Sequence, residues 1–182
     1  MNLPAALVLS AFLFFGSSED KPQIADFEIE LHGRTIEASF ALVNGFSDRL
    51  FERIQTGLAS GFTYQFVLSR DQILWFENRL DESTLEVTAM YNAVTHEYLV
   101  NYKQDGKLID SRIARDREEL ELAMTRFDGL TVFQLNNKKP EKQLTVRVRA
   151  ELGSKTTLLI IPTRVKTDWY RSPRFLSSPE TP

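Results

Sequence analysis

The stretch FEIELHGRTIEASFAL, residues 27–42, decides the fold class of this chain. In both arms of the stretch an apolar side chain occupies every second position. These positions are Phe27, Ile29, Leu31, Ile36, Ala38, Phe40 and Leu42. A period of two on either side of a glycine-containing turn is typical of a β-hairpin with one buried face. The stretch therefore predicts two antiparallel strands joined at His32-Gly33-Arg34, with His32 as a turn residue.

The same alternation recurs along most of the remaining chain. Further strands are predicted at residues 62–76, 85–91, 98–102, 107–113, 130–135, 144–152 and 157–161. Short turns such as Asp105-Gly106 separate several of them, and strands at hairpin spacing pair antiparallel. The pattern predicts a mainly β fold of the α+β kind. We expect an antiparallel, sandwich-like or strongly curved sheet of about eight or nine strands, with two short helices covering an open face or edge.

A first helix is predicted after the break at Asn44-Gly45. Ser47 or Asp48 can cap it, because a short side-chain oxygen accepts a hydrogen bond from a free backbone N–H of the first turn. An apolar stripe at helical spacing follows, formed by Leu50, Phe51, Ile54 and Leu58. Gly61 is then expected to end the helix in the left-handed conformation.

A second helix is predicted from Asp116, which forms a capping-box-like pair with Glu119 three residues later. Its apolar positions fall at helical spacing and are Leu120, Ala123, Met124 and Phe127. Met124 is interpreted as a core residue rather than a ligand. Asp128-Gly129 is expected to end this helix.

Composition limits the classes of function. The chain has 182 residues, no cysteine and a formal net charge of −3, with a pI near 5.5. This length suits one domain. The absence of cysteine excludes disulfides, thiol nucleophiles and cysteine metal sites. Since the chain lacks the basic excess typical of nucleic-acid binding, we expect no nucleic-acid partner.

The N-terminal segment MNLPAALVLSAFLFFGSS, residues 1–18, carries no charged side chain. Leu3 to Phe15 has the length of a signal-peptide apolar core and is short for a membrane span. We expect a signal peptide over 1–18, a single β-rich domain over 19–172 and a Pro- and Ser-rich tail over 173–182. Export with cleavage of this segment is favoured. An uncleaved N-terminal anchor is one alternative, and a buried helix of a cytoplasmic protein is another.

The sequence contains none of the common catalytic or phosphate-binding motifs, such as G-x-S-x-G, the P-loop or H-E-x-x-H. Its two histidines lie far apart in the sequence, at His32 and His96. We therefore expect no enzyme, no cofactor and no metal. A small hydrolase using two carboxylates stays an alternative. Its candidates include Glu28, Glu30 and Glu37, for which a solvated strand face is the favoured interpretation.

Two aromatic pairs and one basic strand face form the candidate partner surface. Arg147 and Arg149 alternate with apolar residues on a predicted strand and can contact phosphate or an acidic partner; solubility and edge protection are the favoured interpretation of this basic face. Each aromatic pair can line a groove or anchor the core, and the core is favoured. The candidate residues are Trp75, Phe76, Arg147, Arg149, Trp169 and Tyr170.

The stretch YNAVTHEYLVNY, residues 91–102, brings His96 together with three tyrosines. It contains no nucleophile, and Tyr91 closes one alternating segment while Tyr98 opens the next. A turn is therefore favoured over a reactive centre. This interpretation predicts that Tyr91 and Tyr98 lie on adjacent antiparallel strands.

Several segments in order carry a family resemblance. They are ALVNGFSDRLFERIQTGLASGFTYQFVLSR, ILWF, YNAVTHEYLV, DREELELAMTRFDG and PTRVKTDWYRSPRF. The series resembles a bacterial family of exported proteins catalogued as domain of unknown function 4390. Its motifs correspond here to Asn44-Gly45, Ser60-Gly61, Trp75, Tyr91 through Tyr98, Glu118-Glu119, and Asp168-Trp169 with Ser172. The chain departs from the pattern at Asn92, where the family has Asp, and in TLLIIPTR, where the family has L-P-x-P.

The resemblance implies an exported bacterial envelope protein without assigned catalytic residues. We therefore expect the periplasm or the extracellular space as its location, with N-terminal anchoring to the inner membrane as the alternative. A non-enzymatic domain that binds an envelope protein, a peptide or a lipid is the favoured hypothesis. An accessory domain of a two-component membrane sensor is a second hypothesis, and the carboxylate hydrolase is a third. A membrane contact is expected only through the N-terminal segment, if that segment stays uncleaved.

Overall fold

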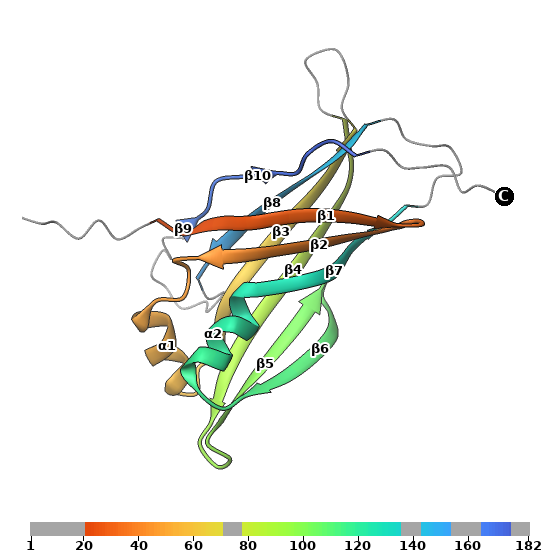
Figure 1. Cartoon of the computed structure of the whole chain (residues 1–182). Helices are drawn as coiled ribbons and strands as arrows, with labels where there is room; N and C mark the ends of the chain where they lie inside the picture. Colours follow the sequence, from red (N-terminus) through yellow and green to blue (C-terminus); the bar gives the residue numbers. More distant parts are fainter. Residues whose placement is uncertain (1–20, 71–77, 136–142, 154–164, 176–182) are drawn as a thin grey trace, which may run out of the picture.

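The computed structural model describes residues 21–70, 78–135, 143–153 and 165–175, which form two antiparallel β-sheets and two short helices (Figure 1). The elements are β1 (Gln23–His32), β2 (Thr35–Val43), α1 (Asp48–Gln55), β3 (Ser60–Arg70), β4 (Asn78–Asn92), β5 (Glu97–Gln104), β6 (Lys107–Ala114), α2 (Arg117–Thr125), β7 (Arg126–Gln134), β8 (Leu144–Leu152), β9 (Val165–Lys166) and β10 (Tyr170–Arg171). The mainly β fold with two helices that the sequence predicted is confirmed.

The smaller sheet has the order β1-β2-β7, and the larger sheet has the order β10-β8-β3-β4-β5-β6, with β9 also pairing to β8. In Figure 1, β1 and β2 cross in front of the long strands β3 and β4, so the two sheets lie face to face. Neither sheet closes into a barrel. We call the face of the larger sheet that is turned away from the smaller sheet the outer face.

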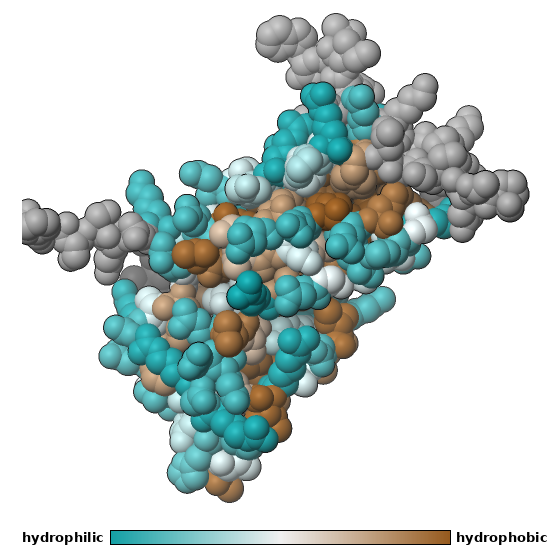
Figure 2. Space-filling model, viewed as in Figure 1, coloured by the Kyte–Doolittle hydropathy of each residue, from teal (hydrophilic) through white to brown (hydrophobic). Residues whose placement is uncertain are grey.

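The hairpin predicted from residues 27–42 is present. β1 and β2 pair from Gln23↔Val43 to His32↔Thr35, and Gly33 takes a positive φ of 60° in the turn. The four alternating apolar positions of β2 are buried, namely Ile36, Ala38, Phe40 and Leu42. The residues between them, Thr35, Glu37, Ser39 and Ala41, point away from the core. Figure 2 shows this side of the molecule as a mixture of hydrophilic residues and apolar areas.

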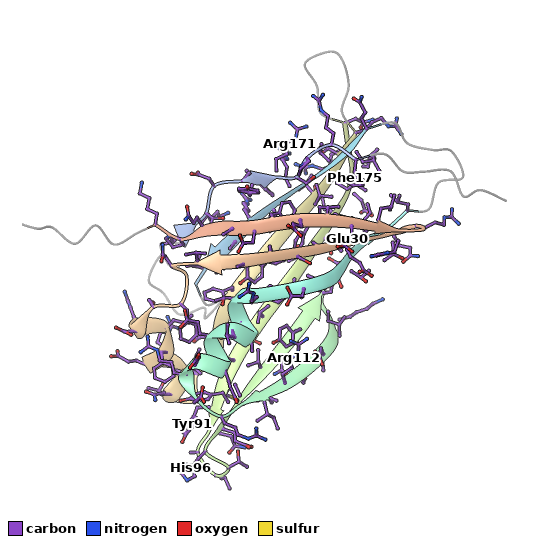
Figure 3. The ribbon with its side chains drawn as sticks, in the orientation of Figure 1. Glu30, Tyr91, His96, Arg112, Arg171 and Phe175 are labelled. Carbon is purple, nitrogen blue, oxygen red and sulfur yellow. The ribbon has the colours of Figure 1, made fainter. Side chains whose placement is uncertain are left out.

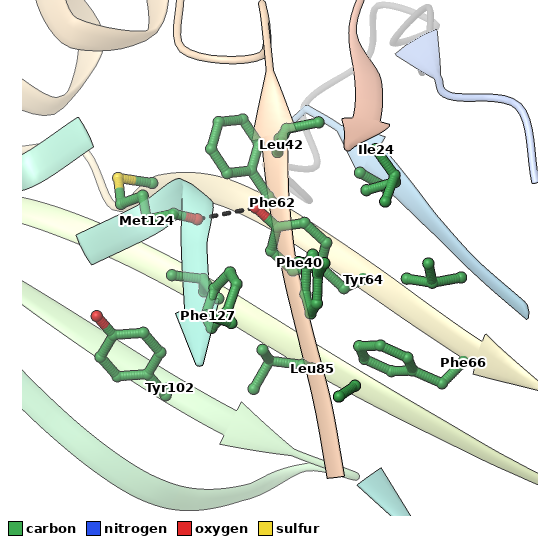
Figure 4. Packing of buried hydrophobic residues seen from close by; sticks show 14 of the residues in the cluster. Ile24, Phe40, Leu42, Phe62, Tyr64, Phe66, Leu85, Tyr102, Met124 and Phe127 are labelled. Atoms are coloured by element: carbon green, nitrogen blue, oxygen red, sulfur yellow. Dashed lines mark hydrogen bonds between the residues drawn. The ribbon is translucent and has the colours of Figure 1, made fainter. Parts of the chain in front are cut away.

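Phe40 occupies the centre of the core between the sheets (Figure 4). Its ring stacks on Phe127 of β7 with centroids 4.8 Å apart. It also meets the larger sheet edge to face, at 5.1 Å from Tyr64 and 5.6 Å from Phe66. Burying one such ring contributes roughly 1.5–3 kcal/mol, and favourable ring geometry adds about 0.5–1.5 kcal/mol. This cluster therefore fixes how the two sheets pack.

Two tyrosines attach α2 to the larger sheet. The Tyr64 hydroxyl donates to the Met124 carbonyl at 2.8 Å, and the Tyr102 hydroxyl donates to the Ala123 carbonyl at 2.7 Å. The last carbonyls of a helix have no partner within the helix, so these hydroxyls complete its C-terminus. Burial raises the pKa of the Tyr64 hydroxyl well above its ordinary value, and the nearby Tyr102 raises it further.

The predicted C-terminus of the second helix was wrong. Asp116 caps α2 as expected, with the Glu119 N–H donating to its carboxylate at 2.8 Å. The helix, however, ends at Thr125 rather than at Asp128-Gly129. Arg126 is already extended, because Phe127 belongs to β7 and packs against Phe40.

The predicted C-terminus of the first helix was also wrong. Ser47 caps α1, which ends at Gln55, and Gly57 rather than Gly61 takes the left-handed conformation with φ of 80°. Leu58 lies beyond the helix and is 54% exposed. Gly61 lies inside β3, where an added Cβ would stand 1.9 Å from the Val87 carbonyl oxygen. The close approach of β4 therefore requires a glycine at position 61.

The predicted hairpin around His96 is confirmed, since Tyr91 of β4 lies opposite Tyr98 of β5 with ring centroids 5.1 Å apart. Figure 3 shows Tyr91 and His96 at the far end of this hairpin. The Asn92 side-chain oxygen accepts hydrogen bonds from the N–H groups of Val94 and Thr95. A carboxylate can accept the same bonds, so the geometry of this turn suits Asp as well as Asn.

The other strand predictions have mixed outcomes. The Asp105-Gly106 turn joins β5 to β6 as expected, and the strand predicted at 130–135 begins earlier, at Arg126. The strands predicted at 73–76 and 157–161 lie outside the described residues.

Candidate functional site on the outer face of strand β8

The C-terminal segment, residues 165–175, covers the edge of β8 and positions the candidate site. The N–H groups of Thr167 and Ser172 donate to the carbonyls of Ala150 and Val146, respectively. In return, the N–H groups of Ala150 and Val146 donate to the hydroxyls of Thr167 and Ser172, at 2.9 and 3.1 Å. Side-chain oxygens thus replace two carbonyls of a regular strand, and the segment follows β8 along its length.

Strand alternation separates the two faces of β8. Val146, Val148 and Ala150 are fully buried in the core between the sheets. Arg147 and Arg149 therefore lie on the outer face, because neighbouring side chains of a strand point to opposite sides.

Trp169 lies over both arginines. Its ring centroid is 5.3 Å from the Arg147 guanidinium carbon and 4.4 Å from that of Arg149. These distances are typical of cation–π contacts. The Arg149 Nε–H also donates to the Gln65 side chain of β3 at 2.8 Å, so this guanidinium has a fixed orientation. Trp169 remains 37% exposed and forms part of the surface.

A third arginine extends this surface. Arg171 of β10 pairs with Arg147 of β8, and opposite residues of an antiparallel pair point to the same side. Its guanidinium donates to the Thr145 hydroxyl at 3.3 Å, which places it on the outer face. Figure 3 labels Arg171 beside β10. We call Arg147, Arg149, Trp169 and Arg171 the Arg–Trp face.

The Arg–Trp face carries three positive charges, although the chain as a whole has a net charge of −3. Two of its guanidinium groups lie against the indole, and Arg171 lies on the same face, opposite Arg147. The nearest acidic residue on β8, Glu151, forms an ion pair with Lys166 at 3.4 Å. Such local concentrations of one sign attract ligands of the opposite sign.

The structure brings together three of the residues predicted for the partner surface, namely Arg147, Arg149 and Trp169. Tyr170 is not among them, because its ring packs edge to face on Phe27 of β1 at 6.0 Å. Trp75 and Phe76 lie outside the described residues. The sequence interpretation missed Arg171, and only its pairing opposite Arg147 reveals it.

The residues considered for other chemistry lie at the ends of two separate hairpins. The His32 imidazole lies 3.0 Å from the Glu30 carboxylate and 3.7 Å from that of Glu37, at the exposed end of the β1–β2 hairpin. His96 lies 2.9 Å from the Tyr91 hydroxyl at the tip of the β4–β5 hairpin. Within the described residues, no group of three or more His, Asp or Glu side chains is placed to hold a metal ion.

The fold and the site define a class: a two-sheet antiparallel β domain whose C-terminal segment builds a positively charged, aromatic surface on one sheet edge. The chain matches the model of the family described as "Domain of unknown function (DUF4390)" over residues 19–174 and belongs to this family. No curated protein and no solved structure matches the chain. Neither helix of the described part is long and apolar enough to span a membrane.

The structure assigns physical roles to the terminal motif that carried the resemblance. Trp169 covers the two β8 arginines, and the Ser172 hydroxyl completes the hydrogen bonding of Val146. Trp169 thus contributes to the Arg–Trp face directly, and Ser172 contributes by holding the C-terminal segment in place.

Proposed function

We propose that the chain is a non-catalytic binding domain that contacts an acidic protein segment through the Arg–Trp face. The observation that carries this proposal is that Arg147 and Arg149 lie against the ring of a partly exposed tryptophan, with Arg171 on the same face of the sheet. A planar guanidinium binds a carboxylate through two parallel hydrogen bonds, which a lysine ammonium cannot do. The chemistry of the surface therefore suits Asp- and Glu-rich segments.

The geometry supports binding in a second way. Stacking on an indole uses the flat side of a guanidinium, whereas its N–H donors lie in the guanidinium plane. Arg149 is oriented both by Trp169 and by Gln65, so little side-chain entropy remains to be lost on binding. An aromatic ring beside arginines is also the composition that dominates the energy of known protein interfaces.

We further propose that this binding takes place in the bacterial cell envelope. The apolar segment Leu3 to Phe15 supports export of the chain. Fractionation of cells expressing the full chain, followed by mass spectrometry of the mature N-terminus, tests this part. Recovery of the protein with an intact N-terminus in the cytosolic fraction would contradict it.

Site-specific crosslinking in cells tests the binding proposal. A photoreactive amino acid replaces Asp168, an exposed residue next to Trp169 in the C-terminal segment. We expect crosslinks to a protein with an acidic segment at the crosslinked site, and their loss when Arg149→Glu and Arg171→Glu are added. The matched control carries the photoreactive residue at Thr131, an exposed position of β7 on the other sheet. Crosslinks that persist in the charge-reversed variant would refute the assignment of this face.

A further inference from the structure

The two edges of the larger sheet differ. The β8 edge is covered by the chain's own C-terminal segment, through Thr167, Ser172 and Phe175. At the opposite edge, β6 has β5 as its strand neighbour, and no other described strand pairs with it. Figure 1 shows β6 at this side of the sheet. An uncovered edge strand carries backbone donors and acceptors that can pair with a further strand.

The side chains at the β6 edge are unusually apolar for a solvent-facing strand. Leu108 and Ile113 are each 60% exposed, and Ile109 is 49% exposed. Ile113 ends a row that crosses the outer face, because it lies opposite Leu99, which in turn lies opposite Met90. All three members of this row are exposed. The apolar row thus runs up to the open edge.

The charges of β6 determine which strand would fit. Asp110 and Arg112 are two residues apart on the same side of the strand and form an ion pair at 2.9 Å. The Arg112 guanidinium lies 4.9 Å from the centre of the Tyr102 ring. A strand that pairs with this edge must therefore place opposite charges across from Asp110 and Arg112.

A second copy of β6 meets this requirement in one register. Two copies of β6 related by a twofold axis pair antiparallel. Side chains on the same face of the sheet lie opposite each other only if the axis passes through a residue rather than between two residues. An axis at Ser111 places Asp110 of each copy across from Arg112 of the other copy. An axis at Asp110 places two carboxylates across from each other, and an axis at Arg112 places two guanidinium groups across from each other.

We propose that the chain forms a symmetric dimer through antiparallel pairing of β6 with β6, centred on Ser111. The larger sheets of the two copies then form one continuous sheet. In this register, Ile109 lies across from Ile113 of the other copy, so the apolar row continues over the interface. The irregular pairing between Tyr102 and Lys103 of β5 marks a bulge at Ile109, which limits the paired segment to Ile109–Ile113. Such a short interface gives a concentration-dependent dimer.

Disulfide trapping tests the register directly, because the natural chain contains no cysteine. The Ser111→Cys variant places one thiol on the twofold axis, where the two Cα atoms lie within the range that a disulfide spans. We expect mild oxidation to crosslink most of this variant at protein concentrations that support the dimer. Thr131→Cys, exposed on β7, is the matched control and should stay uncrosslinked. Equal crosslinking of both variants would overturn the proposal.

Charge reversal distinguishes the pairing between copies from the ion pair within one copy. Asp110→Arg and Arg112→Asp each place like charges across the axis, so we expect sedimentation to show each variant as a monomer. An equimolar mixture of the two places Arg across from Asp at both contacts and should restore the dimer, although the ion pair within each chain remains broken. Circular dichroism confirms that both variants are folded. A mixture that stays monomeric, or a natural chain that is monomeric at every concentration tested, would overturn the proposal.

Discussion

Replacing Tyr64 by Phe removes one oxygen atom from the centre of the molecule and leaves the Met124 carbonyl without its hydroxyl donor. Tyr64 is fully buried, and its hydroxyl lies 2.8 Å from that carbonyl. An unpaired buried carbonyl costs about 1–3 kcal/mol, while the shape of the core is unchanged. For a domain of this size, we expect the melting temperature to fall by roughly 2–4 °C per kcal/mol.

Chemical denaturation of Tyr64→Phe, Tyr102→Phe and Tyr170→Phe measures the difference. The Tyr102 hydroxyl donates to Ala123 in a less buried setting, so its loss should cost less than the loss of the Tyr64 hydroxyl. Tyr170 is exposed and serves as the control, with an expected change within about 0.5 kcal/mol. Equal stability of the Tyr64→Phe variant and the natural chain would refute the role given to this hydrogen bond.

The same hydroxyl gives a pH dependence of known sign. The pKa of Tyr64 is raised in the folded state, first by burial and then by Tyr102. Folding therefore favours the neutral hydroxyl. Its contribution to the free energy of unfolding is complete below the ordinary tyrosine pKa of 10.0 and declines as the pH rises above that value. The free energy of unfolding of the natural chain should fall above pH 10, and Tyr64→Phe should fall less steeply.

Three further substitutions test the account of the fold. Gly61→Ala should destabilise the domain by about 3 kcal/mol, measured by denaturation, because its Cβ would overlap the Val87 carbonyl. Gly33→Ala is the comparison and should cost only about 1–2 kcal/mol, because its turn is open and only its positive φ opposes the alanine. Ser172→Ala should cost about 1–3 kcal/mol and speed proteolysis near the C-terminus, because it leaves the buried Val146 N–H without its acceptor. Asn92→Asp should change stability by less than about 0.5 kcal/mol in thermal melts, since a carboxylate can accept the same two turn hydrogen bonds. A stable Gly61→Ala variant or a strongly destabilised Asn92→Asp variant would contradict these assignments.

The strands could be predicted from the sequence because alternation is a local property. The four buried positions of β2 and the pairing of Tyr91 with Tyr98 follow from a period of two and a turn. The helix caps at Ser47 and Asp116 were equally local, since each depends on one side chain and the first turn that follows it.

The helix ends could not be predicted in the same way, because distant contacts determine them. Either Gly57 or Gly61 could end the first helix on local grounds. Gly61 instead belongs to β3, where the Val87 carbonyl approaches too closely for a residue with a Cβ. Phe127 has helical spacing after Met124, yet its packing on Phe40 draws it into β7. Tertiary packing therefore overrides the local pattern at both positions.

The candidate site was predictable only in part, because some of its residues are placed by local alternation and others by distant pairing. The outward direction of Arg147 and Arg149 follows from alternation along one strand. The positions of Trp169, Tyr170 and Arg171 depend on how a two-residue strand pairs with β8, and no local pattern encodes that register. The face of the sheet on which each of these three side chains lies therefore could not be predicted from the sequence.

Binding of a glutamate-rich peptide to the Arg–Trp face tests the central claim most directly. In the Trp75→Phe variant, Trp169 is the one remaining tryptophan, so its fluorescence reports on this face. We predict a saturable fluorescence change with the glutamate-rich peptide that weakens as salt is added, that is absent with a lysine-rich peptide, and that is lost in Arg149→Glu. No change with the glutamate-rich peptide, or an unaltered titration curve in Arg149→Glu, would contradict the claim.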